Sequence, residues 1–537
     1  MSPQGPPAPP TPRSQDTAGS GASLLARGRA WLRGHERAVA LWLAVGLVLI
    51  RCAPLSFFDA VFDSDQAIIG LMAKHLAEGR AVPVFTYGQD HLLGSQAWMA
   101  APLFWAFGPS VVALKAPLVL VNVVTAVLLV WLLDRELTLR PLTALIVASP
   151  FLLAPPGTAI YFVEASGSQI EPFLVVMLLW LTRRRQLLFG AILGLGYLQR
   201  VFAAYAFGAY LLLELLDRSL LTRGGFIRTV KTGVGFTAVW YVVGTIRTHA
   251  GSAWGPATSG EYFGFPSPVS DAATLNIGLL LERFCFDIAS LPRTIPAFLG
   301  PFLSTFMGGH REPLVFLSIP SDGTQGVDGL WVLLGATLLV ALLRLVWLTA
   351  RRPSVLWGPQ ARFGTYLLAV GGISTAAYLV SQCGRVGPTT MRYTLLTLLG
   401  IIGLVACHLA VETRPALRRL TVGVVTLWAV LTLGTHTRLL AEFVEAPPEN
   451  NRQTLADYLV DNGIRYGYAD FWDVYSTMFL ADEQVILSST SVSYVQQYEW
   501  IVQNHQDEAV WILREPCEGG RQATDVHWIC PPRPGTW

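Results

Sequence analysis

Phe62-Asp63-Ser64-Asp65-Gln66 places two carboxylates just after the first long apolar segment of the chain. The sequence around them is strongly apolar. Hydrophobic residues make up 52% of the 537 residues and charged residues only 14%, whereas a soluble domain carries roughly 25% charged residues. Ionisable residues at a membrane boundary are costly to keep there, so this pair is a functional-site hypothesis. An interfacial loop whose acids only face water is the simpler interpretation.

Repeated apolar runs predict a polytopic α-helical membrane protein of about 11 transmembrane helices. A shorter run, Trp98–Phe107, is expected to be an interfacial or re-entrant piece. We expect the spans at 38–57, 110–133, 141–155, 170–182, 186–199, 201–216, 232–248, 329–349, 363–381, 392–411 and 419–436.

Lys and Arg residues cluster at every second connection between these spans, as in Arg183-Arg184-Arg185. The positive-inside rule assigns such connections, together with the N-terminus, to the cytoplasm. The alternate connections, 58–109, 156–169, 249–328 and 382–391, and the C-terminal tail are then expected outside. A further span near Ile295–Met307 would reverse everything after it.

The chain divides into three expected parts. Residues 1–37 are rich in Pro, Gly and Ser and predict a disordered cytoplasmic tail rather than a signal peptide. A transmembrane domain is expected at 38–446, and a small extracytoplasmic α/β domain at 447–537. In that last domain we expect helices at Leu455–Asn462 and Val474–Leu480 and strands at Tyr466–Asp470, Val485–Ser488 and Val510–Leu513.

Several function classes are disfavoured by composition and motif. The net charge is only +2 and no basic stripe carries interleaved aromatics, so nucleic acid is not an expected partner. No phosphate-binding Gly loop and no metal-ligand spacing is present. Cys517 and Cys530 are expected to form a disulfide if the tail faces an oxidising compartment, and to remain two free thiols otherwise.

The first outer loop begins with a helical pattern over Asp65–Leu76, in which Ile68, Ile69 and Met72 share one face. This pattern predicts an amphipathic helix lying on the membrane. Asp65 would be near its positive N-terminus, and Lys74 and His75 would be solvated at the interface.

The same loop carries the most specific motifs of the chain. It reads FDSDQAIIGLMAKHLAEG from Phe62, PVFTYGQDHLLGSQA from Pro83 and APLFWAFG from Ala101. This resembles the first outer loop of the GT-C superfamily of integral-membrane glycosyltransferases. The family-39-like branch, with protein O-mannosyltransferases and lipid A aminoarabinose transferases, is the most similar. Arg392-Tyr393-Thr394-Leu395-Leu396 is similar to the start of a late span in that family, and Gly467–Trp472 to some of its bacterial outer domains.

The resemblance implies sugar transfer from a polyprenyl-phosphate donor to a hydroxyl of a lipid, glycan or protein, at the outer face of a bacterial plasma membrane. It implies Asp65 as the base, since Asp65 matches the Asp of the family's Asp-Glu-Ala motif, with Asp63 as a second candidate. An inverting displacement needs such a carboxylate for the acceptor proton and donors for the departing phosphate. The candidate phosphate-binding residues are Arg392, His91 and Arg200, and the candidate acceptor-site residues are Gln66, Gln89, Gln96 and Glu164.

Gln66 and Gln96 stand where many relatives carry Glu, which leaves a changed acceptor or a lost activity open. Arg392 also has a simpler interpretation, as a snorkelling residue at the end of a span. No cofactor is expected beyond the lipid-linked donor, and dependence on a divalent metal is left open. Two other functions stay possible: a transporter or flippase, although no internal repeat is found, and a non-catalytic relative that binds the carrier lipid.

Overall fold

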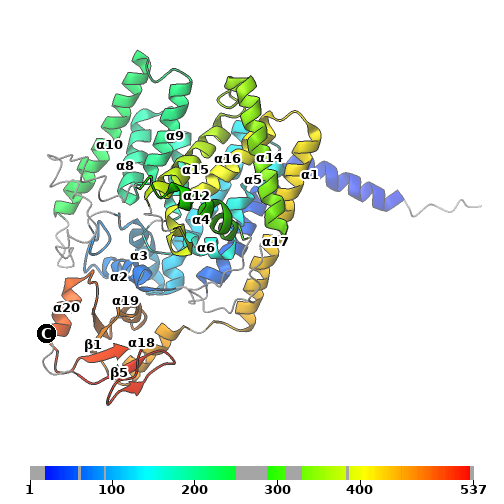
Figure 1. Cartoon of the computed structure of the whole chain (residues 1–537). Helices are drawn as coiled ribbons and strands as arrows, with labels where there is room; N and C mark the ends of the chain where they lie inside the picture. Colours follow the sequence, from blue (N-terminus) through cyan, green and yellow to red (C-terminus); the bar gives the residue numbers. More distant parts are fainter. Residues whose placement is uncertain are drawn as a thin grey trace, which may run out of the picture.

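The computed structural model describes residues 19–57, 62–89, 92–167, 169–249, 287–308, 329–381, 386–448 and 450–532. Helices stand side by side in a bundle, and a small sheet domain is attached at one end (Figure 1). The fold is therefore that of a polytopic helical membrane protein with a small C-terminal α/β unit, as the sequence predicts.

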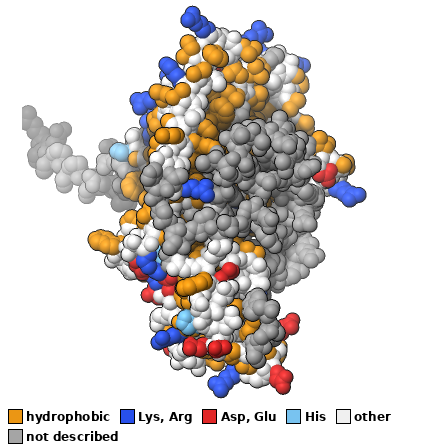
Figure 2. All heavy atoms as spheres, turned by 90° about the vertical axis from the view of Figure 1, so that its left-hand side faces the viewer, with side chains coloured by type: hydrophobic (Ala, Val, Ile, Leu, Met, Phe, Trp, Pro, Cys, Tyr) orange, Lys and Arg blue, Asp and Glu red, His pale blue; other side chains and the backbone are white. Residues whose placement is uncertain are grey.

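Each of the expected apolar segments forms a helix. The first helix begins already at Gly19, so residues 19–37 are helical, and the predicted disordered tail is wrong for this part of the chain. The helices are α1 (Gly19–Ser56), α4 (Val111–Leu137), α5 (Pro141–Leu152), α7 (Glu171–Thr182), α8 (Gln186–Gln199), α9 (Ala203–Leu216), α10 (Arg223–His249), α14 (Gly329–Arg351), α15 (Arg362–Ser381), α16 (Thr397–Val411) and α17 (Pro415–Glu445). By length and composition, five of the described helices can cross a membrane, and α7, α8, α9 and α16 are shorter apolar helices. Large apolar side chains such as Trp42, Tyr241 and Val346 are exposed. Figure 2 shows hydrophobic side chains over the surface of the helical bundle, where lipid would cover them.

One helix lies where the sequence predicts only a connection. α6 (Pro156–Val163) follows α5 after a sharp bend of 83°. Pro155 and Pro156 stand at this bend. Two successive prolines favour a break there, because each lacks a backbone N–H donor and its ring crowds the preceding turn. Pro156 is instead tolerated in the first turn of the new helix. The bend directs the end of α6, and Glu164 after it, towards the first outer loop.

The segment around Ile295–Met307 is made of three short helical pieces, α12 (Leu291–Ala297), a π-helical turn (Phe298–Phe302) and α13 (Leu303–Phe306). It lies against α6 and α17: Thr158 Oγ1 donates to Phe306 O at 2.8 Å and Trp428 Nε1 donates to Met307 O at 3.0 Å. It is not among the described helices that are long enough to span.

Ion pairs join the basic connections at the end of the bundle away from the sheet domain. They connect the middle of α1 with the ends of α4, α7, α9, α14 and α16 and with the start of α15. The pairs are Arg37–Asp134, Arg183–Glu136, Arg362–Asp217 and Arg344–Glu412. Figure 2 shows Lys and Arg side chains at that end. The structure therefore groups the connections that the charge pattern assigns to one side. The side of the membrane that this end faces stays a prediction.

The helix of the first outer loop differs from the prediction. α2 (Ser64–Ala77) is packed between α3 (Ser95–Phe107) and α19 (Phe471–Leu480) rather than lying on a membrane surface. Lys74 and His75 are 5% and 0% exposed, so their expected interfacial solvation is wrong. The reason is a partner from the far end of the sequence, because Lys74 pairs with Asp482 and His75 with Glu483, both in the turn after α19.

The C-terminal domain contains a five-stranded sheet in the order β2-β1-β3-β5-β4. Its strands are β1 (Tyr466–Ala469), β2 (Ile486–Ser489), β3 (Val510–Leu513), β4 (Arg521–Gln522) and β5 (Trp528–Cys530). β1 is parallel to β2 and β3, whereas β5 is antiparallel to both β3 and β4. Helices α18 (Asn451–Asp461), α19 and α20 (Gln496–Gln503) complete the domain, and Cys517 and Cys530 form a disulfide.

A buried ionic cluster fixes this domain to the first outer loop. Glu483 accepts from Tyr498 OH at 2.7 Å, lies 3.1 Å from both His75 Nε2 and Lys74 Nζ, and pairs with Arg80. Burial alone would raise the pKa of Glu483, but hydrogen bonds from His75 and Arg80 outweigh it and hold the pKa well below 4.5. The charged form of Glu483 therefore stabilises the contact between the two parts.

Candidate active site

Asp65 and Arg392 form the centre of the site. Asp65 lies in the first turn of α2, and Arg392 lies in a short 3-10 turn (Pro388–Tyr393) that precedes α16. Arg392 Nη1 is 3.7 Å from Asp65 Oδ2, and the two side chains are 30% and 28% exposed. Two residues from distant parts of the sequence therefore present opposite charges to a space that is still open to solvent.

Asp63 has a different position. Its Oδ1 accepts a hydrogen bond from Gln66 N at 3.1 Å, which makes Asp63 the N-cap of α2. Asp63 thereby holds the start of the helix that carries Asp65. Of the two acids in the motif, Asp65 is the one that pairs with Arg392.

The surroundings of Asp65 raise its pKa to about 6. Burial is the largest cause, and the nearby charge of Asp63 adds to it. Arg392 and Arg200 act in the opposite direction but do not cancel these effects. A carboxylate with a pKa near the working pH is suited to accept a proton during a reaction.

Arg392 and Arg200 lie near the same aromatic ring. The guanidinium carbon of Arg392 is 5.2 Å from the centre of the Tyr393 ring, and that of Arg200 is 5.8 Å from it. Two cations held this close to one ring repel each other, and an anion between them would offset the repulsion. Guanidinium groups bind phosphate oxygens with two parallel hydrogen bonds, so this arrangement suits a phosphate.

Glu164 contributes a third carboxyl group from the connection after α6. It is 8% exposed, and burial, followed by the charge of Asp63, raises its pKa. Glu164 Oε2 and Arg392 Nε are both buried without a hydrogen-bond partner among the residues that the structure describes. Such buried polar atoms are rare in folded proteins and require an explanation, which a bound polar ligand would supply here.

Gln66 and Gln96 connect the first outer loop to the second. Ala165 N donates to Gln66 Oε1 at 3.3 Å, and Gly167 N donates to Gln96 Oε1 at 3.0 Å. Gln96 Nε2 in turn donates to Glu171 Oε1 at 2.7 Å. The amide group of Gln96 can accept from a backbone N–H and donate to a carboxylate at the same time, which a charged Glu cannot do.

The C-terminal domain also reaches this region through Tyr494, which sequence reasoning did not identify. Tyr494 is hydrogen-bonded to the Gln89 side chain and lies within electrostatic reach of Asp65 and Arg392. Gly88 allows the contact: its φ is +70°, and a Cβ there would come within 2.8 Å of Tyr494 Cα. No local signal marks Tyr494, because its role depends on how the two domains pack.

Lys115 is a second residue that the sequence did not single out. It is fully buried near the start of α4, and its Nζ donates to Leu55 O at 3.1 Å, close to the C-terminal end of α1. Its charge also lowers the pKa of Glu164. A cation at the C-terminal end of a helix is stabilising, which gives Lys115 a clear role in holding α1 and α4 together.

One predicted site residue cannot be placed in this geometry. His91 lies outside the described residues, so its role stays a prediction. Among the residues that the structure describes, no group of three or more His, Cys, Asp or Glu side chains is placed to hold a metal ion.

No protein-family model matches the chain, and no curated protein sequence matches it. Similar solved structures include the oligosaccharyltransferase AglB of Archaeoglobus fulgidus, in complex with an inhibitory peptide and a dolichol-phosphate. The identity is 12%, the TM-score is 0.45, and the match covers 90% of this chain and 70% of that one. ArnT of Cupriavidus metallidurans bound to undecaprenyl phosphate matches with 12% identity and a TM-score of 0.40, over 91% of this chain and 96% of that one. At 12% identity, the similarity to each of them concerns the fold alone.

Proposed function

We propose that this protein transfers a sugar from a polyprenyl-phosphate donor to a hydroxyl group of a lipid, glycan or protein acceptor. The observation that carries the proposal is the Asp65–Arg392 pair, in which a carboxylate with a raised pKa faces a guanidinium across 3.7 Å. The reaction needs one group that accepts a proton and one that stabilises a departing phosphate. The pair offers both, side by side.

In the proposed reaction, the acceptor oxygen attacks the anomeric carbon of the sugar while its proton passes to the Asp65 carboxylate. The bond between the anomeric carbon and the phosphate oxygen breaks, and polyprenyl phosphate leaves. Arg392 and Arg200 stabilise the negative charge that develops on the phosphate. A single displacement of this kind inverts the configuration at the anomeric carbon.

Glu164 is proposed to orient the acceptor. Because its pKa is raised by burial, Glu164 keeps its proton more readily than an exposed glutamate does. A protonated carboxyl group can donate a hydrogen bond to a sugar or acceptor oxygen while its second oxygen accepts one. Gln66 and Gln96 support Glu164 indirectly, since they hold the backbone that follows it.

Gln66 and Gln96 stand where many members of the resembled family carry Glu, but neither replacement removes the carboxylate that the proposed reaction uses. Gln66 and Gln96 hold the second loop, whereas Asp65 and Arg392 are both present and paired. We further propose that the site faces the outer side of the membrane. The Cys517–Cys530 disulfide supports this orientation, because disulfides persist in oxidising compartments.

The test is a donor-consumption assay with the full-length protein in lipid nanodiscs. Radiolabelled polyprenyl-phosphate sugars, prepared from cell membranes, are incubated with the protein and a membrane extract as the acceptor source. We expect free polyprenyl phosphate to appear together with label on an acceptor. Tight donor binding without turnover would instead indicate a non-catalytic carrier-binding protein. Movement of the intact donor between leaflets without cleavage would indicate a flippase. Either result contradicts the proposal.

A further inference from the structure

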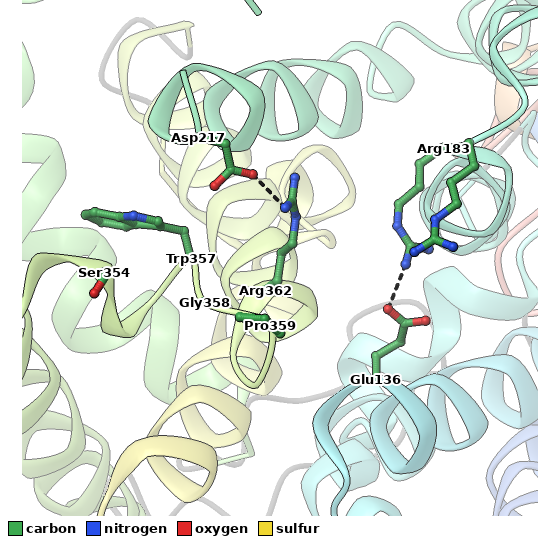
Figure 3. A pocket seen from close by; sticks show the side chains of 9 residues that line it. Glu136, Arg183, Asp217, Ser354, Trp357, Gly358, Pro359 and Arg362 are labelled. Carbon is green, nitrogen blue, oxygen red and sulfur yellow. Dashed lines mark hydrogen bonds and ion pairs between the residues drawn. The ribbon is translucent and has the colours of Figure 1, made fainter. Parts of the chain in front are cut away.

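A cavity of about 620 Å³ opens at the end of the bundle where the basic connections meet (Figure 3). Asp65 is not among the residues that line it. The cavity lies between the ends of α4, α7 and α9 on one side and the start of α15 with the connection before it on the other. This volume falls in the range of roughly 300–1,000 Å³ that is typical of ligand sites. Nothing in the proposed transfer reaction uses this cavity.

The charged residues of the cavity form two pairs and leave one cation over. Arg183 Nη2 donates to Glu136 Oε2 at 2.8 Å, and Arg362 Nη1 lies 2.6 Å from Asp217 Oδ2. Figure 3 shows these two pairs facing each other across the opening. Arg184 also lines the cavity, is exposed, and has no ion-pair partner in the described part of the chain.

Other acidic residues near the cavity do not cancel this excess of one positive charge. Glu214 lies 3.3 Å from Arg362, but it also pairs with Arg228 at 2.6 Å. The cavity walls therefore carry three arginines against two acids, with the two paired arginines held in place by their partners. An anion that enters would meet Arg184 first and find further N–H donors of Arg183 and Arg362 on the walls.

The position of the cavity favours a lipid over a soluble anion. The cavity lies at the end of an apolar bundle, and Trp357, a half-buried aromatic residue, is part of its lining. Tryptophan is enriched at the membrane–water interface. Basic pockets between transmembrane helices on the cytoplasmic side bind anionic lipid headgroups. We infer that this cavity binds the phosphate group of an anionic phospholipid, with Arg184 as the residue that recruits it.

The experiment measures lipid binding, so its outcome is independent of the proposed transferase activity. Full-length protein in a neutral detergent is titrated with phosphatidylglycerol or phosphatidylcholine, and bound lipid is counted by native mass spectrometry. Arg184→Ala is compared with Arg185→Ala. Both variants lose one positive charge. Arg185 is the next residue and is also exposed, but it does not line the cavity, so it is the matched control.

We expect phosphatidylglycerol to bind more tightly than phosphatidylcholine, and Arg184→Ala to weaken it about fivefold, as the loss of one basic contact with an anionic membrane surface would. Arg185→Ala should bind like the unchanged protein, and Arg184→Glu should bind more weakly than Arg184→Ala. Equal effects of Arg184→Ala and Arg185→Ala would overturn the assignment, because they would reflect net charge alone. Displacement of the lipid by an equal concentration of inorganic phosphate would assign the cavity to a soluble anion and overturn the lipid inference.

Discussion

Arg392 Nη1 lies 3.7 Å from Asp65 Oδ2, a separation longer than that of a tight charge-assisted hydrogen bond. The pair is therefore close enough for each charge to affect the other, yet Arg392 keeps donors for a further partner. Its Nε has no hydrogen-bond partner within the described residues. In the proposed reaction this spare capacity is used by the leaving phosphate.

The pKa of Asp65 predicts the acid side of the pH profile. Because Asp65 accepts a proton only when it is ionised, the rate should fall as the pH drops below about 6. Asp63→Asn should move this limb to lower pH, since removing the neighbouring negative charge lowers the pKa of Asp65. Asparagine is as good an N-cap as aspartate, so α2 should stay intact. If the rate fell at the same pH in Asp63→Asn as in the unchanged protein, Asp65 would not be the titrating group.

Arg392→Lys tests the phosphate-binding role. Lysine keeps the charge but cannot make the two parallel hydrogen bonds of a guanidinium. We expect transfer to fall by about 10²–10³, the usual effect of losing one donor to a developing anion. Arg438→Lys is the control, because Arg438 is an exposed helix residue that pairs only with Glu442 among the described side chains. Equal rates for both variants would argue against phosphate binding by Arg392.

Gln96→Glu tests whether the amide at this position is required. The change would place a second carboxylate next to Glu171, where Gln96 now donates a hydrogen bond across 2.7 Å. We expect a loss of about 1–3 kcal/mol of unfolding free energy at high pH, where both groups would be charged. At low pH one carboxyl keeps a proton and restores the hydrogen bond. Thermal unfolding at pH 5 and pH 8 should therefore differ more in Gln96→Glu than in the unchanged protein.

The contact between the C-terminal domain and the first loop should weaken in acid. The lowered pKa values of Glu483 and His75 mean that both groups stabilise the folded form only while unprotonated. For His75, burial is the main cause. The contribution of these two groups to the free energy of unfolding is therefore complete above pH 6.5. It decreases as the pH falls, first because His75 becomes protonated and then, below pH 4.5, because Glu483 does.

Hydrogen exchange of α2 measures this contact directly. We expect amide protection in α2 to decrease between pH 7 and pH 4, after correction for the intrinsic exchange rate. Glu483→Gln should lower the protection at pH 7, since Lys74 and Arg80 lose their shared carboxylate. If amide protection in α2 at pH 7 were the same in Glu483→Gln as in the unchanged protein, the ionic cluster around Glu483 would not be what holds the C-terminal domain to the first outer loop.

The sequence alone predicts the apolar helices, because apolar runs in a membrane protein leave few alternatives to a helix. It does not predict the first part of α1 (residues 19–37), α6 or α20. Three strands of the C-terminal domain are also predicted to within about a residue or two, which is inside the usual boundary error. β4 and β5 were not predicted, since strands of two and three residues have too little alternation to detect.

The site is only partly visible in the sequence. Asp65 and Arg392 were identified from motifs, but their contact depends on the tertiary fold. The buried state of His75 could not be predicted, because its partner Glu483 is 408 positions away. Tyr494 was missed for the same reason: its position next to Gln89 depends on how the C-terminal domain packs on the loop.

The most direct test of the central claim compares Asp65→Asn with Asp63→Asn in the donor-consumption assay at pH 8. Both variants lose one carboxylate from the same motif, and Asp63→Asn keeps the helix cap. The account predicts that Asp65→Asn lowers the rate of polyprenyl phosphate release by about 10²–10⁴, as loss of a general base does. Asp63→Asn should stay within a few-fold of the unchanged protein. A rate for Asp65→Asn within a few-fold of the unchanged protein would contradict the account.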